Sequence, residues 1–227
     1  QRLGSADNKI IAITSKIDAK DYLWAVSLEG HFITEWQKGR QVYSFDLRSL
    51  DNSLMTLRES ILVVYALARS FGVAPKNILN NCNGFMSLKH RNQEVDVIRD
   101  VAFINDSKAT NVDATRHALK IYKNVHLIIG GQAKENNFEQ LQDSIKNVSQ
   151  IYPMGEAASL IAGSFKGHKL EQFNTLDQAL ERAISYSREG DTILFSPACA
   201  SFDQYLNFEE RGDHFISLVN KYRKSSI

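Results

Sequence analysis

The sequence contains few of the residues that form disulfide bonds, metal sites or thiol redox sites. Its only cysteines, Cys82 and Cys199, lie far apart in the chain, and no CxxC pair or Cys/His cluster is present. The sequence therefore predicts no metal site. Because unpaired cysteines fit a reducing compartment, we expect a cytoplasmic protein.

Neither charge nor hydrophobicity is concentrated in one part of the chain. The 27 basic and 26 acidic residues are interspersed and leave a formal net charge of +1. A protein without a basic stripe has little general attraction for nucleic acid. No apolar run approaches the roughly 20 residues of a membrane-spanning helix, and the N-terminus lacks the residue order of a signal peptide. We therefore expect neither nucleic acid nor a membrane as a partner.

Two common phosphate-binding motifs are also missing. Neither the GxxxxGK[ST] loop of P-loop proteins nor the GxGxxG turn of dinucleotide-binding proteins occurs anywhere in the chain. A dinucleotide-dependent oxidoreductase is therefore disfavoured. The chain also shows no internal repeats and no low-complexity stretches.

From about residue 95 onward, short apolar segments alternate with segments of helical spacing. We expect strands at 100–106, 125–131, 149–155, 168–173 and 191–197, and helices at 111–122, 137–148, 156–165, 175–187 and 208–222. This alternation favours an α/β fold with an open, mostly parallel, Rossmann-like sheet and helices on both faces.

The first 88 residues have a different pattern. We expect consecutive antiparallel strands and then two helices, at 9–14, 21–30, 31–37, 41–47, 54–72 and 74–85. So few elements make a thin core for an independent domain. We interpret residues 1–88 as the end of a domain and residues 89–227 as a second domain. The opening QRLGSADNK, without an initiator methionine, agrees with a fragment.

The stretch FINDSKATNVDATRHALK places a run of polar residues and one lysine between a strand and a helix. Thr110 and Asp113 have the spacing of a capping box, and Asn111 alone is a good N-cap. Capping explains these residues but leaves Lys108 unexplained. A helix N-terminus beside a lysine could instead hold a carboxylate or a phosphate.

Two other polar turns follow strands, GGQAKENN with Lys134 and SPACASFDQYLNFEERG. Because the carboxyl ends of parallel strands share one edge, we expect all three turns there, with Lys108 and Lys134 following neighbouring strands and facing one cleft. Structural alternatives remain open. The glycines could serve only the turn, Cys199 could be a small buried residue, and 209–211 could be a solvated helix start.

Three motifs, taken in their order along the chain, resemble the Mur ligase family and within it the enzymes that add D-glutamate. They are FINDSKATN, LIIGGQAK and SPACASFDQYLNFEERG, with KHR upstream. The likeness runs over almost the whole chain and is strongest after residue 85. It implies the end of a central ATP-binding domain over 1–88 and an amino-acid-binding domain over 89–227. It also implies a monomeric enzyme of peptidoglycan biosynthesis that uses ATP and Mg²⁺ to convert UDP-N-acetylmuramoyl-L-alanine to an acyl phosphate, which the D-glutamate amine attacks.

The resemblance also implies roles for individual side chains. The positions that would hold the carboxylates of D-glutamate are Lys108, Thr110, Lys134, Ser201 and the backbone at Phe208, with the two lysines also acting in catalysis. The positions on the nucleotide side would be His90, Arg91 and Asp106. A dicarboxylate needs cations and N–H donors at two separated points, and three turns at one sheet edge can supply them.

The chain departs from the family pattern in two respects. The family's phosphate-binding loop, magnesium ligands and modified lysine belong to earlier sequence, so we expect this chain alone to be inactive. Where the family has Gly-x-His-Asn-x-x-Asn, this chain reads LMTLRES, with Thr56, Leu57 and Ser60 at the polar positions, and HRNQ replaces His-Arg-x-Glu. A non-catalytic carboxylate-binding module that has lost ATP binding is therefore the alternative to a ligase.

Overall fold

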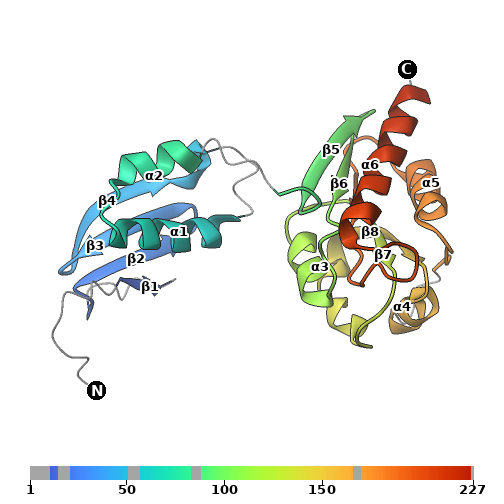
Figure 1. Cartoon of the computed structure of the whole chain (residues 1–227), viewed down its shortest axis with the longest axis horizontal. Coiled ribbons are helices and arrows are strands. Elements are labelled where there is room, and N and C mark those ends of the chain that lie inside the picture. The colour runs from blue at the N-terminus through green and yellow to red at the C-terminus, as the bar shows by residue number, and fades with distance from the viewer. Residues whose placement is uncertain (1–10, 15–20, 51–56, 83–87, 166–169, 226–227) are drawn as a thin grey trace. The chain divides into compact units, whose positions relative to one another are not determined.

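The computed structural model describes residues 11–14, 21–50, 57–82, 88–165 and 170–225. The chain divides into two compact units, Gln1–Met86 and Ser87–Ile227 (Figure 1). Among the described residues, no helix has the length and apolar character needed to cross a membrane.

The first unit is a four-stranded sheet with two helices packed against it. The strands lie in the order β1 (Ala12–Thr14), β2 (Trp24–Glu29), β3 (Phe32–Gln37) and β4 (Arg40–Asp46), followed by a 3₁₀ turn, η2 (Leu47–Ser49), and the helices α1 (Arg58–Ser70) and α2 (Pro75–Cys82). The expected antiparallel pairing is confirmed for β2, β3 and β4. It was wrong for β1, which pairs with β2 in parallel.

A buried carboxylate joins α1 to the sheet of this unit. Arg69 Nε donates to Glu35 Oε2 at 2.8 Å, and the Tyr65 hydroxyl donates to the same oxygen at 2.8 Å. Burial raises the pKa of Glu35, but hydrogen bonds from Arg69, Tyr65 and Trp24 outweigh it and hold that pKa below its ordinary value. Glu35 is therefore a paired, charged residue of the core.

The second unit contains the sheet that the strand and helix alternation predicted. Its strands lie in the order β5 (Gln93–Ile98), β6 (Val101–Asn105), β9 (Thr192–Phe195), β7 (Val125–Gly130) and β8 (Val148–Met154). β5 is antiparallel to β6, and the other pairs are parallel. The helices are α3 (Val112–Leu119), α4 (Ala158–Ser164), α5 (Leu176–Tyr186) and α6 (Phe208–Ser225). The predicted mostly parallel α/β fold is confirmed.

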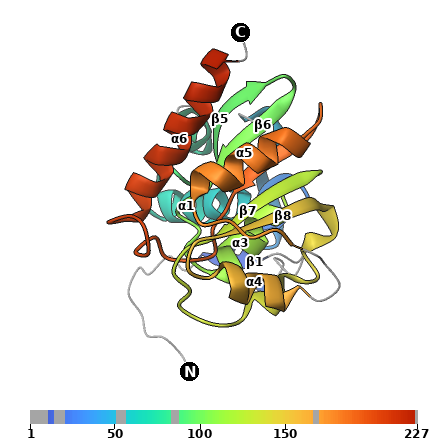
Figure 2. The ribbon, with the colours of Figure 1, turned by 90° about the vertical axis from the view of Figure 1, so that its right-hand side faces the viewer.

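Helices cover both faces of this sheet (Figure 2). Leu127 and Ile129 of β7 pack on the side of α3 and α4, whereas Ile128 packs on the side of α5 and α6. Successive side chains of a strand point to opposite faces, so a strand between two helical layers is buried on both sides. All six residues of β7 are buried.

Three elements of the second unit differ from expectation. The helix expected at 137–148 is instead two 3₁₀ turns, η4 (Phe138–Leu141) and η5 (Ile145–Asn147). Their apolar residues are buried and have the spacing that indicated a helix. The strand expected at 168–173 forms only an isolated bridge, between Phe173 and Met154, and residues 168 and 169 lie outside the described part. β5 was not expected, although its alternation of polar and apolar residues is typical of an edge strand with one exposed face.

Candidate functional site

The carboxyl ends of the parallel strands β6, β7, β8 and β9 meet at one edge of the second sheet. Residues 106–111 follow β6, residues 131–137 follow β7, and residues 196–207 follow β9. The structure therefore brings the three polar turns to one edge, as predicted. One detail was wrong: β9 lies between β6 and β7, so Lys108 and Lys134 do not follow neighbouring strands.

Asp106 is buried where the turn after β6 meets the turn after β9. Ser196 Oγ donates to Asp106 Oδ2 at 2.8 Å, and the backbone N–H of Asn92 donates to Oδ1 at 3.1 Å. Burial raises the pKa of Asp106 to about 6, against the opposing effect of these two bonds and of the positive charge of Arg91. This carboxyl group therefore titrates close to neutral pH.

Arg211 of α6 is completely buried beneath the same turns. Its guanidinium donates to Ser107 Oγ at 3.1 Å and to the carbonyl oxygens of Ser107, Cys199 and Ala200 at 2.9, 3.1 and 3.0 Å. Burial lowers the pKa of Arg211 to about 10. Arg211 therefore holds the turns after β6 and β9 together, and the alternative of a solvated residue at this position was wrong.

The sequence did contain a signal for this burial. Arg211, Phe215 and Val219 lie four residues apart and occupy the buried face of α6. A charged residue in line with an apolar helical stripe is more consistent with a buried, hydrogen-bonded group than with a solvated one.

His90 is held by a network that fixes its protonation. The Asn105 side chain accepts from Ser107 N through Oδ1, and its Nδ2 donates to the Gly212 carbonyl and to His90 Nδ1, each at 3.0 Å. Because Nδ1 accepts, the ring proton lies on Nε2, which is 3.7 Å from Asp213 Oδ1. Burial lowers the pKa of His90, although the nearby Asp213 opposes this effect. The ring is thus a neutral part of the fold.

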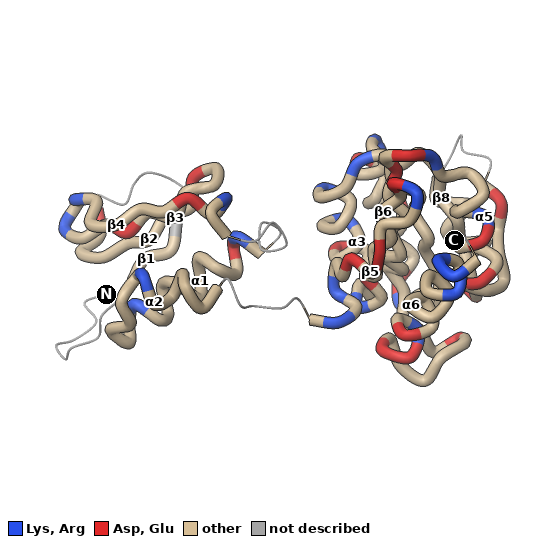
Figure 3. The backbone as a smooth tube through the Cα atoms, turned by 90° about the horizontal axis from the view of Figure 1, so that it is seen from above, with Lys and Arg blue, Asp and Glu red and all other residues tan. Residues whose placement is uncertain are grey.

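The exposed charged groups at this edge have both signs, because Glu135, Glu209 and Glu210 are exposed as well as three cationic residues. Lys108, Lys134 and Arg91 are exposed, Thr110 and Phe208 are half-buried, and Ser201 is buried. The Lys108 ammonium lies 3.9 Å from the centroid of the Phe208 ring. Positive and negative residues are interspersed over the second unit (Figure 3). Exposed ammonium groups beside buried hydroxyl groups can bind carboxylates or phosphates.

Gly130, the last residue of β7, and Gly131, which follows it, pack against the backbone of other segments. A Cβ atom on Gly131, whose φ is +131°, would collide with the Ala200 carbonyl, and one on Gly130 would collide with the backbone of Met154. Gln132 and Ala200 exchange backbone hydrogen bonds of 2.9 Å. These contacts give both glycines a structural role and fix the segment that leads to Lys134.

Cys199 and the predicted helix caps also have structural roles. Cys199 is fully buried, and burial raises the pKa of its thiol to about 12. The Asn111 side chain accepts from Ala114 N at 2.9 Å and caps α3. Thr175 caps α5 by accepting from Gln178 N.

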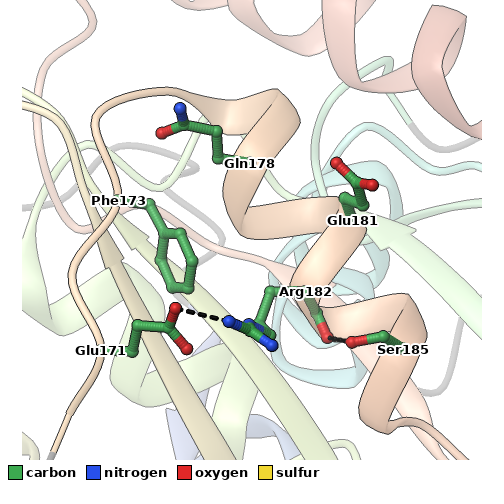
Figure 4. A pocket seen from close by; sticks show the side chains of 6 residues that line it. All are labelled: Glu171, Phe173, Gln178, Glu181, Arg182 and Ser185. Carbon is green, nitrogen blue, oxygen red and sulfur yellow. Dashed lines mark hydrogen bonds and ion pairs between the residues drawn. The ribbon is translucent and has the colours of Figure 1, made fainter.

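Each unit also has a hollow among its described residues. One, of about 560 Å³, is lined by Glu171, Phe173, Gln178, Glu181, Arg182 and Ser185 (Figure 4). Its central charges pair with each other, because Arg182 Nη2 lies 2.7 Å from Glu171 Oε1. The other, of about 360 Å³, lies between α1 and α2 and includes Leu57 and Ser60. Thr56 lies outside the described residues.

A magnesium site would need several carboxylate or similar oxygen ligands close together. Within the described segments, no group of three or more His, Cys, Asp or Glu side chains could hold a metal ion. The described residues therefore do not fit a magnesium site.

Comparison with known sequences reveals close relatives. The family described as "Mur ligase, glutamate ligase domain" matches residues 90–199. The chain is 37% identical over 220 residues to the UDP-N-acetylmuramoylalanine–D-glutamate ligase of Roseobacter denitrificans, and the match covers 96% of this chain and 47% of that protein. The protein of the same name from Dinoroseobacter shibae is 38% identical over 218 residues, with the same coverage. The chain thus spans about half the length of these curated relatives.

Solved structures share the fold. The UDP-N-acetylmuramate–alanine ligase of Thermotoga maritima gives a TM-score of 0.62 at 18% identity, over 89% of this chain and 46% of that one. FolC of E. coli in complex with ADP gives 0.59 at 17% identity, over 89% and 47%. At these identities the likeness concerns the fold alone. The family match and the curated relatives confirm the resemblance seen in the motifs: residues 90–199 carry a Mur ligase, glutamate ligase domain, and the chain is a relative of the D-glutamate ligases of that family.

Proposed function

We propose that this chain forms the D-glutamate-binding half of an ATP-dependent ligase that extends UDP-N-acetylmuramoyl-L-alanine in peptidoglycan biosynthesis. The observation that carries the proposal is the gathering of two exposed lysines, Lys108 and Lys134, at one edge of a parallel sheet. Such edges are the usual ligand sites of open α/β folds. In this proposal the first unit is the end of a central ATP-binding domain, and the second unit binds the amino acid.

The exposed groups suit a dicarboxylate. Lys108 and Lys134 supply cations from different turns, Thr110 and Ser201 supply hydroxyl groups, and the backbone at Phe208 begins a helix that presents N–H groups. Binding both carboxylates leaves the amine of D-glutamate as its remaining polar group. An amine held at a fixed position attacks an acyl phosphate faster than a freely diffusing one, and nearby lysine charge stabilises the developing oxyanion.

The nucleotide side is assigned to Arg91, which precedes β5, and to Asp106, which follows β6. Arg91 is exposed, and its charge acts on the pKa of Asp106. A guanidinium group suits a phosphate or an adenine ring. His90 contributes through the fold, because its carbonyl accepts from Lys108 N at 2.9 Å. In this proposal ATP and Mg²⁺ are cofactors of the full-length ligase.

A titration of the isotopically labelled chain with D-glutamate, followed by NMR, tests the binding site. We expect saturable shifts in the turns after β6, β7 and β9, smaller shifts with L-glutamate, and weaker binding by Lys108→Ala and Lys134→Ala. Lys146→Ala is the matched control, since Lys146 is an exposed lysine that precedes β8, at the other end of the strands. Shifts that do not saturate, or equal weakening by Lys146→Ala, would reject the assignment.

The alternative is a carboxylate-binding module without catalysis, motivated by LMTLRES in place of the family's adenine-side motif. Phosphate release by the full-length protein that carries this sequence separates the two. A ligase releases phosphate only when ATP, D-glutamate and the UDP precursor are all present. A module binds D-glutamate and releases none. The chain by itself should hydrolyse no ATP above background, because it has no GxxxxGK[ST] loop.

A further inference from the structure

The ring of Phe208 contacts two other groups at the sheet edge. The Lys108 ammonium lies 3.9 Å from the ring centroid. The His90 ring packs edge-on, with centroids 6.3 Å apart and an angle of 79° between the planes. The Phe208 backbone is held separately, because its carbonyl accepts from Ser107 Oγ at 2.8 Å. The ring and the backbone of this residue therefore make different contacts.

The Phe208 ring is closely packed on the side of His90. The His90 ring is fixed by Asn105, and a Cβ atom on Gly212 would collide with the imidazole, so ring and helix backbone are in close contact. Lys108 itself is exposed and has a long, flexible side chain, which loses considerable rotamer freedom when an ion pair immobilises it. A lysine ammonium over an aromatic face is held there by the ring quadrupole.

We propose that the Phe208 side chain is a positioning residue for Lys108. Its ring holds the ammonium above the turn after β6 before any anion binds, so that less side-chain entropy is lost on binding. This role is separate from the backbone contact assigned to Phe208 in the proposed function. The inference rests on the proposed function only for the identity of the anion, D-glutamate.

The restraint on Lys108 can be tested in the chain without any ligand. Protons above an aromatic ring shift upfield in NMR spectra, so the side-chain methylene protons of Lys108 should lie upfield of those of exposed lysines such as Lys146. Phe208→Leu should abolish this shift, and Phe208→Tyr should keep it. Phe202→Leu, which alters an exposed phenylalanine of the turn after β9, should also keep it. Phe208→Met replaces the Leu variant if that one does not fold.

The functional consequence is tested with D-glutamate and the same variants. Phe208→Leu should weaken binding by about two- to fivefold, whereas Phe208→Tyr should bind like the unmodified chain. An upfield shift that is absent, or that survives in Phe208→Leu, overturns the positioning role. Equal D-glutamate affinity in the Leu and Tyr variants overturns it as well. If the ring-dependent shift is present but D-glutamate does not bind at all, the proposed function fails and the restraint on Lys108 stands.

Discussion

At the scale of single residues, the polar groups of this edge divide into those used by the fold and those left for a ligand. Asp106, His90 and Arg211 are buried and hydrogen-bonded to neighbouring turns. Lys108 and Lys134 are exposed. A buried polar group without partners costs free energy, so the first set is satisfied inside the protein. The exposed set is satisfied by water and can exchange water for an anion.

Replacing Arg211 by methionine should destabilise the second unit by about 3 kcal/mol, because several buried carbonyl oxygens lose their donor. Urea unfolding followed by the circular dichroism of the chain measures this. Arg223→Met is the matched control on the same helix, since Arg223 is half-exposed and lies 3.3 Å from Asp96. Such a surface pair contributes less than about 1 kcal/mol. Similar losses in both variants would contradict a structural role for Arg211.

The pH dependence of Asp106 follows from its raised pKa. The folded value of about 6 exceeds the ordinary value of 3.8, so the folded protein binds the proton more tightly than the unfolded chain does. Ionising Asp106 therefore lowers stability as pH rises from about 4 to about 6, by about 3 kcal/mol in total, and has no further effect above that range.

The carboxyl carbon resonance of Asp106 should accordingly titrate with a midpoint near 6. Ser196→Ala should move the midpoint upward, because the Ser196 hydroxyl donates to the ionised carboxylate. Ser185→Ala, at an exposed serine of α5, should leave it in place. A midpoint near 4 in the unmodified chain would show that the carboxyl group is not buried as described.

At the scale of elements, the packing of α6 depends on a glycine. A Cβ atom at Gly212 would collide with the His90 imidazole, whereas one at Gly163 of α4 would meet open space. An alanine in a helix is normally more stable than a glycine by up to about 1 kcal/mol. Gly163→Ala should therefore raise the thermal midpoint, and Gly212→Ala should lower it. The prediction fails if the two substitutions have the same sign.

The strands and helices also show how much of the fold the sequence predicts. β6, β7 and β9 are apolar runs between turn residues, so they could be predicted. β5 was missed, although the alternation in QEVDVI is the pattern of an edge strand with one exposed face. The role of Arg211 depends on Ser107, which lies 104 residues away in the sequence, and periodicity indicates only that the position is buried. Contacts between distant turns are set by tertiary packing, which a single sequence does not contain.

At the scale of the whole molecule, the proposed ligase uses separate turns of this chain for its substrates. Lys134 follows β7, in a turn fixed by the glycine contacts with the turn after β9. Arg91 precedes β5, and its charge acts on Asp106. A residue that contacts one substrate should affect the KM for that substrate alone. Selectivity therefore distinguishes a binding role from a contribution to folding.

In the full-length ligase, Lys134→Ala should raise the KM for D-glutamate far more than the KM for ATP, and Arg91→Ala should do the reverse. Losing a charge-assisted hydrogen bond to a carboxylate costs about 1.5 to 3 kcal/mol, which corresponds to roughly ten- to hundredfold in affinity. Both KM values are measured for both variants, with thermal unfolding as a control. Lys134→Ala should change stability by no more than about 0.5 kcal/mol, because the Lys134 side chain is exposed. For Arg91→Ala, the unfolding control separates the loss of the charge that acts on Asp106 from the loss of a substrate contact. Equal shifts for ATP and D-glutamate in both variants would reject the separation of the two sites.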